Sequence, residues 1–369
     1  MDIAIKDERE GHELKLMLDG KSVSGLELLD LDLRIGIAKF KLGGIAGVRT
    51  DDGHRMKGYA SKVLSRSIEY MVEKKYDVSM LFGIGDFYHR WGFATCLPDY
   101  ELTISTRNAE RASKGYSSIP FELRDVDDIL AIYENNNVHR SCWVERSKDT
   151  WEPFKKGTWY DRPAKASVVL DEGKIVGYYA YDDSKNDVRI TEIGFGKRDV
   201  FESMLREFAE MAIEKRVERI YVNIPPDHPF ATFCRRYGCS MSIGYPYGAN
   251  GMMRIINLHS FLQKLRPELE RTIGEPSHHN TRRTLIITTD IGEAAINISG
   301  HEVIIEDSSS HADASIYLPQ AVLIQCISGF RCVSEMLTDS TVKYSDEIED
   351  MLSDLFRQTY PHCWPADAF

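Results

Sequence analysis

The 369-residue sequence lacks an apolar run near the roughly 20 residues that a membrane-spanning helix needs. Its first eight residues, Met1 to Glu8, lack the apolar core of a signal peptide. No cysteine pair has Cys-x-x-Cys spacing and the seven cysteines are an odd number, which disfavours a zinc site, a redox motif and a disulfide framework. We therefore expect a soluble, cytoplasmic protein with reduced thiols, no metal and no membrane partner.

Motifs of several other enzyme classes are also missing. The sequence shows no P-loop, no Ser-His-Asp arrangement and no paired-carboxylate motif, and the pair His278-His279 lies in a polar segment that we expect to be an exposed linker. The net charge of −11 disfavours a nucleic-acid-binding surface and is compatible with a cationic substrate. What is present is a hydrophobic fraction of 43%, which at this length predicts two or three domains with their own cores.

The most informative stretch runs from Gly44 to Phe93. It begins with the apolar run Gly-Ile-Ala-Gly-Val at 44–48 and continues through a turn that contains Arg-Met-Lys-Gly at 55–58. A helix is expected from residue 60, because apolar residues recur at three- and four-residue spacing at Val63, Leu64, Ile68, Met71 and Val72. A glycine turn that leads into a helix N-terminus presents free backbone N–H groups and the positive end of the helix dipole, which suits a phosphate or pyrophosphate.

The residues after this helix make the pattern specific. A short apolar strand at 78–82 is followed by Gly-Ile-Gly and then by the turn Asp-Phe-Tyr-His-Arg-Trp-Gly-Phe at 86–93. This order of elements resembles the GNAT superfamily of acetyl-CoA-dependent N-acetyltransferases. It consists of an Arg-x-x-Gly-x-Ala segment that opens a helix, then a strand, and then a Phe-Tyr-x-Arg-aromatic-Gly-aromatic turn. The resemblance implies that the glycine turn holds the coenzyme A pyrophosphate, that the preceding strand pairs with the pantetheine arm, and that the tyrosine lies near the sulfur.

This resemblance assigns roles to individual residues. The coenzyme-binding residues implied are Val48, Arg49, Arg55, Met56, Lys57, Gly58, Tyr59 and Ala60. Backbone N–H groups near Val48 and Arg49 would stabilise the oxyanion, and the pyrophosphate would lie at the 55–60 turn. Tyr88 would act as the general acid, because a phenol with a reference pKa of about 10 stays protonated at neutral pH. His89, which follows it, is a candidate for orienting the substrate.

The remaining sequence indicates further domains. Residues 1–43 alternate as strands, although a GNAT domain usually begins with a strand and two helices, so we expect a first domain with a shortened N-terminal region and a more open acceptor side. The segment Tyr100 to Ser105 is expected to complete this domain, and 106–118 to form a linker. Residues 119–255 repeat the order of elements, with a hairpin at 166–181 and a helix at 200–216, but lack the glycine turn of a coenzyme site.

From residue 256 the pattern changes to one helix at 258–265, a polar break at 274–282, four strands between 284 and 318, and helices at 320–327 and 345–358. This layout resembles the sterol-carrier-like third domain of the enhanced intracellular survival (Eis) family. The fold class expected is therefore α/β (α+β): two GNAT-like mixed-sheet domains, at 1–118 and 119–255, and a smaller sterol-carrier-like α+β domain at 256–369.

Three tryptophans of the second domain, Trp143, Trp151 and Trp159, either pack in a core or line an acceptor pocket.

The sequence finishes with an apolar, proline-containing segment, from Tyr360 to Phe369. In the Eis family the terminal carboxylate enters the first domain's active site as the general base, so the resemblance gives that role to Phe369. The reference pKa of an α-carboxyl, about 3.3–3.7, makes it a poor base in water, and burial or a water relay would be needed. The resemblance also implies a homo-oligomer, a hexamer in that family.

The function expected is transfer of an acetyl group from acetyl-CoA, the co-substrate, to a primary amine of a small cationic acceptor such as a polyamine or an aminoglycoside. Two alternatives stay open. One is a non-catalytic acyl-CoA- or lipid-binding protein, suggested by the short N-terminal region. The other is an N-acetyltransferase that acts on protein or peptide amines, which an open acceptor side would admit.

Overall fold

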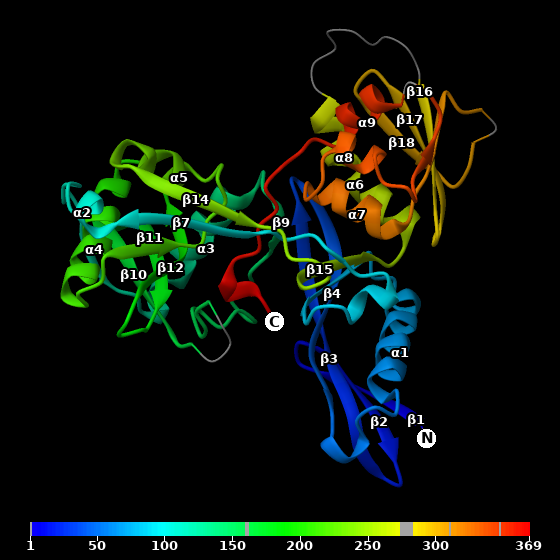
Figure 1. Cartoon of the computed structure of the whole chain (residues 1–369), viewed down its shortest axis with the longest axis horizontal. Coiled ribbons are helices and arrows are strands. Elements are labelled where there is room, and N and C mark those ends of the chain that lie inside the picture. The colour runs from blue at the N-terminus through cyan, green and yellow to red at the C-terminus, as the bar shows by residue number, and fades with distance from the viewer. Residues whose placement is uncertain (1, 159–161, 274–282, 310, 347) are drawn as a thin grey trace. The chain divides into compact units, whose positions relative to one another are not determined.

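The computed structural model describes residues 2–158, 162–273, 283–309, 311–346 and 348–369. The chain divides into two compact units, which are described separately (Figure 1). Unit 1 consists of Met1–Leu97, Pro246–Pro361 and Phe369, and unit 2 consists of Pro98–Tyr245 and His362–Ala368. No helix in the described part of the chain is long and apolar enough to span a membrane.

The first sheet of unit 1 contains the strands of the stretch from Gly44 to Phe93. Its strands are β1 (Asp2–Glu8), β2 (Gly11–Leu18), β3 (Lys21–Ile35), β4 (Ala38–Thr50), β5 (Val78–Gly83), β6 (Ala94–Thr95) and β15 (Asn250–Ile255). Their order is β1-β2-β3-β4-β5-β15-β6. The first four strands are antiparallel neighbours, whereas β4 and β5 are parallel and are joined through helix α1 (Tyr59–Glu73). The predicted strands before residue 43 and the predicted helix after residue 60 are confirmed.

Helix α1 covers one face of this sheet (Figure 1). Its apolar stripe, with Val63, Leu64 and Met71, is buried against side chains of β2 and β3 in a single hydrophobic core. Two 3-10 turns lie near the ends of the parallel strands: η1 (Asp52–His54) after β4 and η2 (Tyr88–Trp91) after β5. No helix precedes η1 among the described residues 2–51.

The C-terminal part of unit 1 is a second sheet with helices. The strands are β16 (Arg283–Thr289), β17 (Gly292–Ser299), β18 (Glu302–Glu306), β19 (Ala314–Tyr317) and β20 (Lys343–Tyr344), in the order β18-β17-β16-β19-β20. The helices are α6 (Leu258–Ile273), α7 (Gln320–Ser328), α8 (Val333–Leu337) and α9 (Glu349–Leu355). Phe261 of α6 stacks on Phe40 of β4 with ring centroids 4.5 Å apart, which joins this part to the first sheet. The expected break at 274–282, with His278-His279, lies outside the described residues.

Unit 2 is built around one sheet of seven strands in the order β14-β7-β13-β12-β11-β10-β8. The strands of this unit are β7 (Asp99–Ser105), β8 (Ser117–Pro120), β9 (Ser141–Val144), β10 (Ala164–Asp171), β11 (Lys174–Asp182), β12 (Val188–Phe195), β13 (Arg219–Val222) and β14 (Cys239–Gly244). Its helices are α2 (Thr106–Ala109), α3 (Val126–Asn137), α4 (Val200–Glu214) and α5 (Pro229–Cys234), and its 3-10 turns are η3 (Leu123–Asp125), η4 (Arg235–Tyr237) and η5 (Pro365–Asp367). The hairpin predicted at 166–181 is confirmed as β10 and β11.

Two strands belong to sheets other than those expected. Residues Tyr100 to Ser105 were expected to complete the first domain, but β7 lies between β13 and β14 in the sheet of unit 2. Residues 250–255 were expected within the second domain, but β15 pairs with β5 in unit 1. Alternation of apolar residues predicts a strand but not its partner, because pairing depends on residues far away in the sequence.

The tail of unit 2, residues 362–368, is anchored in that unit. The Trp364 side chain is 2% exposed, and its indole N–H donates to Asn137 Oδ1 at 3.1 Å. Arg146 lies between two buried carboxylates, with Nε 2.6 Å from Asp367 Oδ1 and Nη1 2.7 Å from Glu192 Oε1. Both carboxylates also accept tyrosine hydroxyls, so this buried cluster of charges is fully hydrogen-bonded and fixes the tail.

Candidate active site

The antiparallel pairing of β3 and β4 contains a bulge near the end of β4. Glu27 pairs with Ala46 and Gly25 pairs with Arg49, so the two residues Gly47 and Val48 lie opposite Leu26 alone. Gly47 has a φ of +58°, in the left-handed region that glycine adopts readily. A bulge turns backbone groups away from the regular ladder, which gives the amides near Val48 and Arg49 a new direction.

The same strand separates from its parallel neighbour. The pairing of β4 with β5 covers Leu42–Ile45 and Val78–Leu81, although β4 continues to Thr50 and β5 to Gly83. In the described part of the chain, residues 46–50 therefore have β3 as a partner on one edge and no strand on the other. We call this opening the β4–β5 fork. An extended arm with amide groups can add to such an edge as a further strand does.

Beyond the fork lies the glycine turn. Arg55, Met56, Lys57 and Gly58 are all exposed, and Gly58 is the N-cap of α1 with φ +75° and ψ 17°. A Cβ atom on Gly58 would meet nothing within 4 Å, so the left-handed backbone rather than crowding explains this glycine, and the space above it is open. Arg55 pairs with Asp52 at 2.9 Å.

The beginning of α1 is suited to an anion. The first intrahelical bond runs from Lys62 N–H to Gly58 O, so the amides of Tyr59 and Ala60 precede it, and no side chain caps them. The first turn carries no acidic residue, and the ammonium of Lys57 bonds to Gly53 O at 3.0 Å. Free N–H groups, the helix dipole and two cations at one place form a phosphate-binding arrangement.

Tyr88 reaches the fork from the face that α1 covers. Its ring is 8% exposed, lies in the same core as Leu64 and Met71, and passes so close to Gly83 that a Cβ atom there would be 2.5 Å from the ring. Burial raises the pKa of the Tyr88 phenol, so the group stays protonated beyond the ordinary range of tyrosine. No hydrogen bond to its hydroxyl is found within the described part of the chain, which leaves it available to a ligand.

Phe369 lies on the opposite face of the same sheet. Its ring is 5.5 Å from the ring of Phe82 on β5, and a Cβ atom on Gly44 of β4 would be 2.8 Å from its Cζ. The neighbour Gly43 faces Met71 of α1 instead, and successive strand residues point to opposite faces. The two residues predicted as acid and base therefore lie against β5 and β4 from the two sides.

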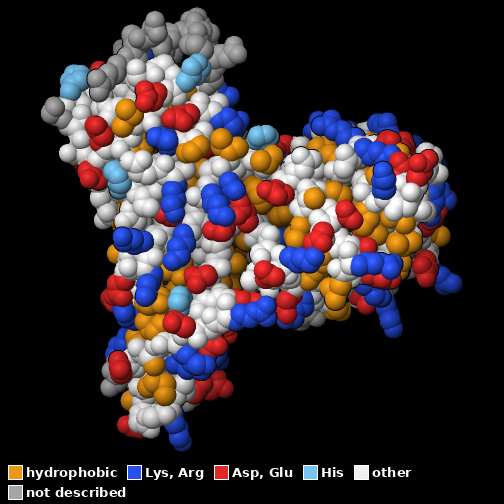
Figure 2. Space-filling model, turned by 180° about the vertical axis from the view of Figure 1, so that it is seen from behind, with side chains coloured by type: hydrophobic (Ala, Val, Ile, Leu, Met, Phe, Trp, Pro, Cys, Tyr) orange, Lys and Arg blue, Asp and Glu red, His pale blue; other side chains and the backbone are white. Residues whose placement is uncertain are grey.

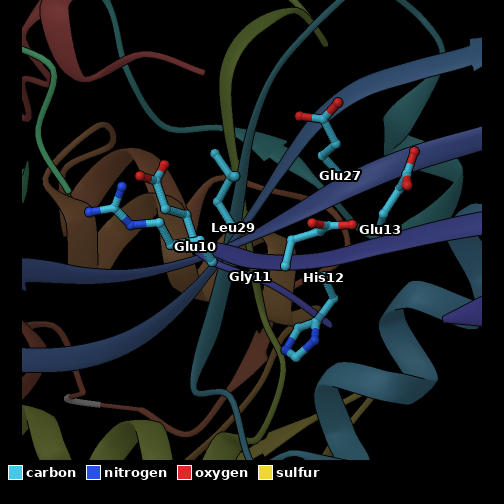
Figure 3. Close-up of a pocket in the computed structure, with 8 residues that line it drawn as sticks. Glu10, Gly11, His12, Glu13, Glu27 and Leu29 are labelled. Carbon is cyan, nitrogen blue, oxygen red and sulfur yellow. The ribbon is translucent and has the colours of Figure 1, made fainter. Parts of the chain in front are cut away.

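Acidic side chains extend along the Phe369 face of the sheet. Glu13 and Glu27 are directly opposite each other on β2 and β3 and point to the same side, whereas His12 points the other way (Figure 3). They border a cavity of about 430 Å³ that Leu29 and residues of the β1–β2 turn also line. Arg49 lies 3.3 Å from Glu13 and 3.7 Å from Glu27, so this cavity adjoins the bulge of β4.

Other sequence candidates are placed differently. His89 is exposed, Trp143 is 2% exposed in the core of unit 2, and Trp151 packs against Phe154, so core packing is confirmed for both rings. Trp159 lies outside the described residues.

Acidic and basic side chains are interspersed over the face of the molecule shown in Figure 2, and the acidic side chains do not form one patch there that would account for the net charge of −11.

Sequence reasoning missed three residues that shape the candidate site. Gly44 lies against the Phe369 ring and Gly83 against the Tyr88 ring, and the side-chain amide of Gln320 donates to Gly92 O at 2.5 Å. The adjacent glycines at 43–44 and 83–85 could have signalled close approaches, because glycine within a strand often marks one. Gln320 gave no signal, since a glutamine in a helical run is usually exposed.

Residues 9–96 match the family model described as an acetyltransferase (GNAT) domain. No curated protein matches the chain. One similar solved structure is a conserved protein of unknown function from Enterococcus faecalis V583, described as a probable N-acyltransferase. It is 16% identical to this chain with a TM-score of 0.77, and the match covers 98% of this chain and 90% of that protein.

Two further structures are similar in fold. A GCN5-related N-acetyltransferase from Anabaena variabilis is 12% identical with a TM-score of 0.76, covering 97% of this chain and 89% of its own. Eis1 from Mycobacterium abscessus is 14% identical with a TM-score of 0.66, covering 97% and 90%. The protein thus has the mixed α/β fold of these structures, and its residues 9–96 are similar to a GNAT acetyltransferase domain.

Proposed function

We propose that the protein transfers the acetyl group of acetyl-CoA to the primary amine of a small cationic acceptor of the polyamine or aminoglycoside type. The observation that supports this most directly is the β4–β5 fork, with Tyr88 on one face of the sheet and Phe369 on the other. Amine acetylation needs a base that takes a proton from the nucleophile and an acid that protonates the departing thiolate. Two groups on opposite sides of the thioester can perform both tasks without interfering.

The coenzyme would be held by residues on either side of the fork. Its pyrophosphate would bind at the turn of Arg55, Met56, Lys57 and Gly58 and the first amides of α1, at Tyr59 and Ala60. Its pantetheine arm would lie along residues 46–50 as an added strand. The amides near Val48 and Arg49, redirected by the bulge, would donate to the carbonyl oxygen as negative charge develops there.

In the proposed reaction, the α-carboxylate of Phe369 takes a proton from the acceptor ammonium, directly or through water. The nitrogen lone pair then forms a bond to the thioester carbon while the carbon–sulfur bond breaks. Sulfur leaves with the bonding electrons and receives the proton of the Tyr88 hydroxyl. The new amide nitrogen then loses its second proton, which returns to the Tyr88 phenolate through water, and the Phe369 carboxyl group releases its proton to solvent. The products are an N-acetylamine and coenzyme A. Since burial raises the pKa of Tyr88, a proton is present on the phenol throughout the physiological range.

Of the two carboxylates on the Phe369 face, Glu13 is paired with Lys15 at 2.6 Å, whereas Glu27 lies 3.7 Å from Arg49 and supports a cationic acceptor. Glu13 and Glu27 border a cavity that adjoins the bulge, where an acceptor amine would have to approach the thioester. Carboxylates beside a site raise the local concentration of cations and help to orient them. Glu27→Gln should therefore raise the KM of a polyamine more than that of a monoamine, whereas Glu69→Gln on the exposed side of α1 should change neither.

A peptide or protein amine is the second candidate acceptor. The observation that favours it is the lack of helices among residues 2–51, since the two helices that usually wall a GNAT acceptor site are not there.

We propose in addition that β12, α4 and β13 form a second GNAT-like crossover without a coenzyme site, and that residues 256–369 are sterol-carrier-like. We also propose that the protein is cytoplasmic and forms a homo-oligomer, a hexamer by resemblance. Light scattering of the purified protein tests the oligomeric state.

The test is mass spectrometry of acceptors incubated with the protein and acetyl-CoA. Polyamines, aminoglycosides, arylalkylamines and lysine peptides are offered separately, and calorimetry measures acetyl-CoA binding in parallel. Acetylation of one class of small amine supports the proposal, and acetylation of lysine peptides alone selects the second candidate. Coenzyme binding without acetylation of any acceptor would contradict both.

A further inference from the structure

The turn that carries Tyr88 makes few hydrogen bonds of its own. The turn η2 is a single 3-10 turn that ends at Gly92, whose N–H donates to His89 O at 2.9 Å. Short 3-10 turns have poor hydrogen-bond geometry and are marginal in isolation. The position of Tyr88 therefore depends on what holds the turn from outside.

Side chains from the C-terminal half of unit 1 hold the carbonyl groups at the end of this turn. Arg254 of β15 donates through Nη1 to Trp91 O. Gln320 of α7 donates through Nε2 to Gly92 O at 2.5 Å, and Gln325 of the same helix donates to Thr95 O at 2.9 Å. Carbonyls that would otherwise lack partners are thus bound by residues more than 160 positions away in the sequence.

Gln320 is the centre of this arrangement. Its side chain is 0% exposed and bridges two elements, because Oε1 accepts the N–H of Ile255 on β15 at 2.9 Å while Nε2 donates to the turn. The backbone N–H of Gln320 is in turn held by Asp290 Oδ1 at 2.6 Å. The side-chain amide of Gln320 is therefore held in place by contacts other than its bond to Gly92. A residue that orients a catalytic group must be fixed in this way.

Gly92 shows how closely these groups fit. Its φ is +74°, and a Cβ atom there would lie 2.5 Å from Arg254 Nη1 and 2.8 Å from Gln320 Nε2. The glycine in the aromatic turn of the sequence is therefore needed both for its left-handed backbone and for the approach of these two donors.

We propose that Gln320 is a positioning residue for acetyl transfer: it holds the turn at Gly92 and thereby sets the Tyr88 hydroxyl against the leaving sulfur. This inference rests on the role of Tyr88 in the proposed function. It gives α7, outside the GNAT-matched residues 9–96, a part in catalysis. A displacement of about 1 Å in a reacting group can cost up to about a hundredfold in rate, so loss of this support should appear in kcat.

The experiment is a double-mutant cycle on kcat for thiol release, with Gln320→Met, Tyr88→Phe and the double variant in the full chain. We expect Gln320→Met to lower kcat by about tenfold or more in the wild-type background and by less than about twofold in the Tyr88→Phe background. The Kd for acetyl-CoA should stay within about threefold, because the glycine turn is untouched. Gln263→Met is the control for loss of an amide donor at an exposed position, since that amide also donates to a backbone carbonyl, of Ile305 at 2.7 Å, but is not linked to the turn.

Gln320→Glu separates positioning from a purely structural role. The new carboxyl group can still accept the Ile255 N–H, but it can donate to Gly92 O only when protonated. Its kcat relative to wild type at the same pH should therefore fall as the pH rises through the pKa of that carboxyl group.

The outcomes separate the two claims. If Tyr88→Phe lowers kcat but Gln320→Met does not, the positioning role is wrong and the acid role stands. The same conclusion follows if the fold reduction of kcat in the double variant equals the product of the reductions in the two single variants. Unchanged kcat in Tyr88→Phe overturns both. Loss of folding in both Gln320 variants, with melting temperatures far below that of Gln263→Met, also overturns the inference, because Gln320 would then be a structural residue.

Discussion

The ring of Phe369 lies directly on the backbone of Gly44, with space for a hydrogen atom but not for a methyl group between them. A Cβ atom on Gly44 would be 2.8 Å from Phe369 Cζ and 3.1 Å from Leu31 Cδ1. We therefore predict that Gly44→Ala displaces the ring and lowers kcat by about tenfold or more while acetyl-CoA binding persists. Steady-state kinetics and calorimetry test this. Gly53→Ala, where a Cβ atom would meet nothing within 4 Å, is the control, and equal kcat in both variants would refute the prediction.

The pH dependence of kcat should reflect the raised pKa of Tyr88. The folded protein raises the pKa of Tyr88, so the acid loses its proton only above the ordinary tyrosine value of about 10. At saturating substrates, the wild-type kcat should not decline before pH 10, and Tyr88→Phe should lower it by about a hundredfold or more at pH 8. Tyr70→Phe, which alters another buried phenol of the same core, should leave the pH–rate profile unchanged. A profile of Tyr88→Phe that parallels the wild type at similar kcat would rule out the acid role.

Coenzyme affinity should depend on the glycine turn. Replacement of Arg55 and Lys57 by alanine removes two exposed cations beside the N-terminus of α1, and we expect the Kd of acetyl-CoA to rise by about tenfold with kcat at saturation retained. The effect should shrink at high ionic strength because exposed charges are screened. Titration calorimetry at two salt concentrations measures it, with Lys74→Ala at the other end of α1 as the control. A Kd equal to that of the control would argue against a pyrophosphate at this turn.

Acid stability provides a separate test of unit 2. Burial and Arg140 lower the pKa of His362 to about 3, and burial also holds the pKa of His228 well below its usual value. The unfolded chain takes up these protons near pH 6.5, so it binds more protons than the folded state, and stability falls as the pH drops below 6.5. Each histidine should contribute about 1.4 kcal/mol per pH unit to that loss.

Urea unfolding at pH 7.5, 6.0 and 5.0 measures this slope before most carboxylates titrate. The variant His228→Gln with His362→Gln should be less stable at pH 7.5 but should lose less stability on acidification than the wild type. The exposed His89→Gln is the control. Equal slopes in the wild type and the double variant would contradict the assignment of both histidines as neutral buried groups.

The elements of the fold could be predicted from the sequence, because the signals are local. The spacing of Val63, Leu64 and Met71 fixes the buried face of α1, and the alternation in residues 26–35 predicts a strand. The sheet to which β7 and β15 belong could not be predicted, since the same alternation suits either sheet.

The local elements around the candidate site were predictable to the same extent. A glycine followed by a helix at 58–60 and an aromatic turn at 86–93 are short-range patterns. In the structure the first lies directly before α1 and the second follows β5. The bulge at Gly47 and Val48 depends on register with β3, and the bond from Gln320 to Gly92 joins residues 228 positions apart. Such features arise only from tertiary pairing, for which a single sequence carries no periodic signal.

The most direct test of the account is the kcat of thiol release from acetyl-CoA in two altered proteins, compared with the wild type, using an amine that the acceptor panel identifies. One carries Tyr88→Phe, and the other has a glycine appended after Phe369, which keeps the ring but moves the terminal carboxylate. We predict that each lowers kcat by about a hundredfold or more while acetyl-CoA affinity stays within about threefold. Wild-type kcat in both proteins would contradict the central claim that an acid and a base act on the thioester from opposite faces of the sheet.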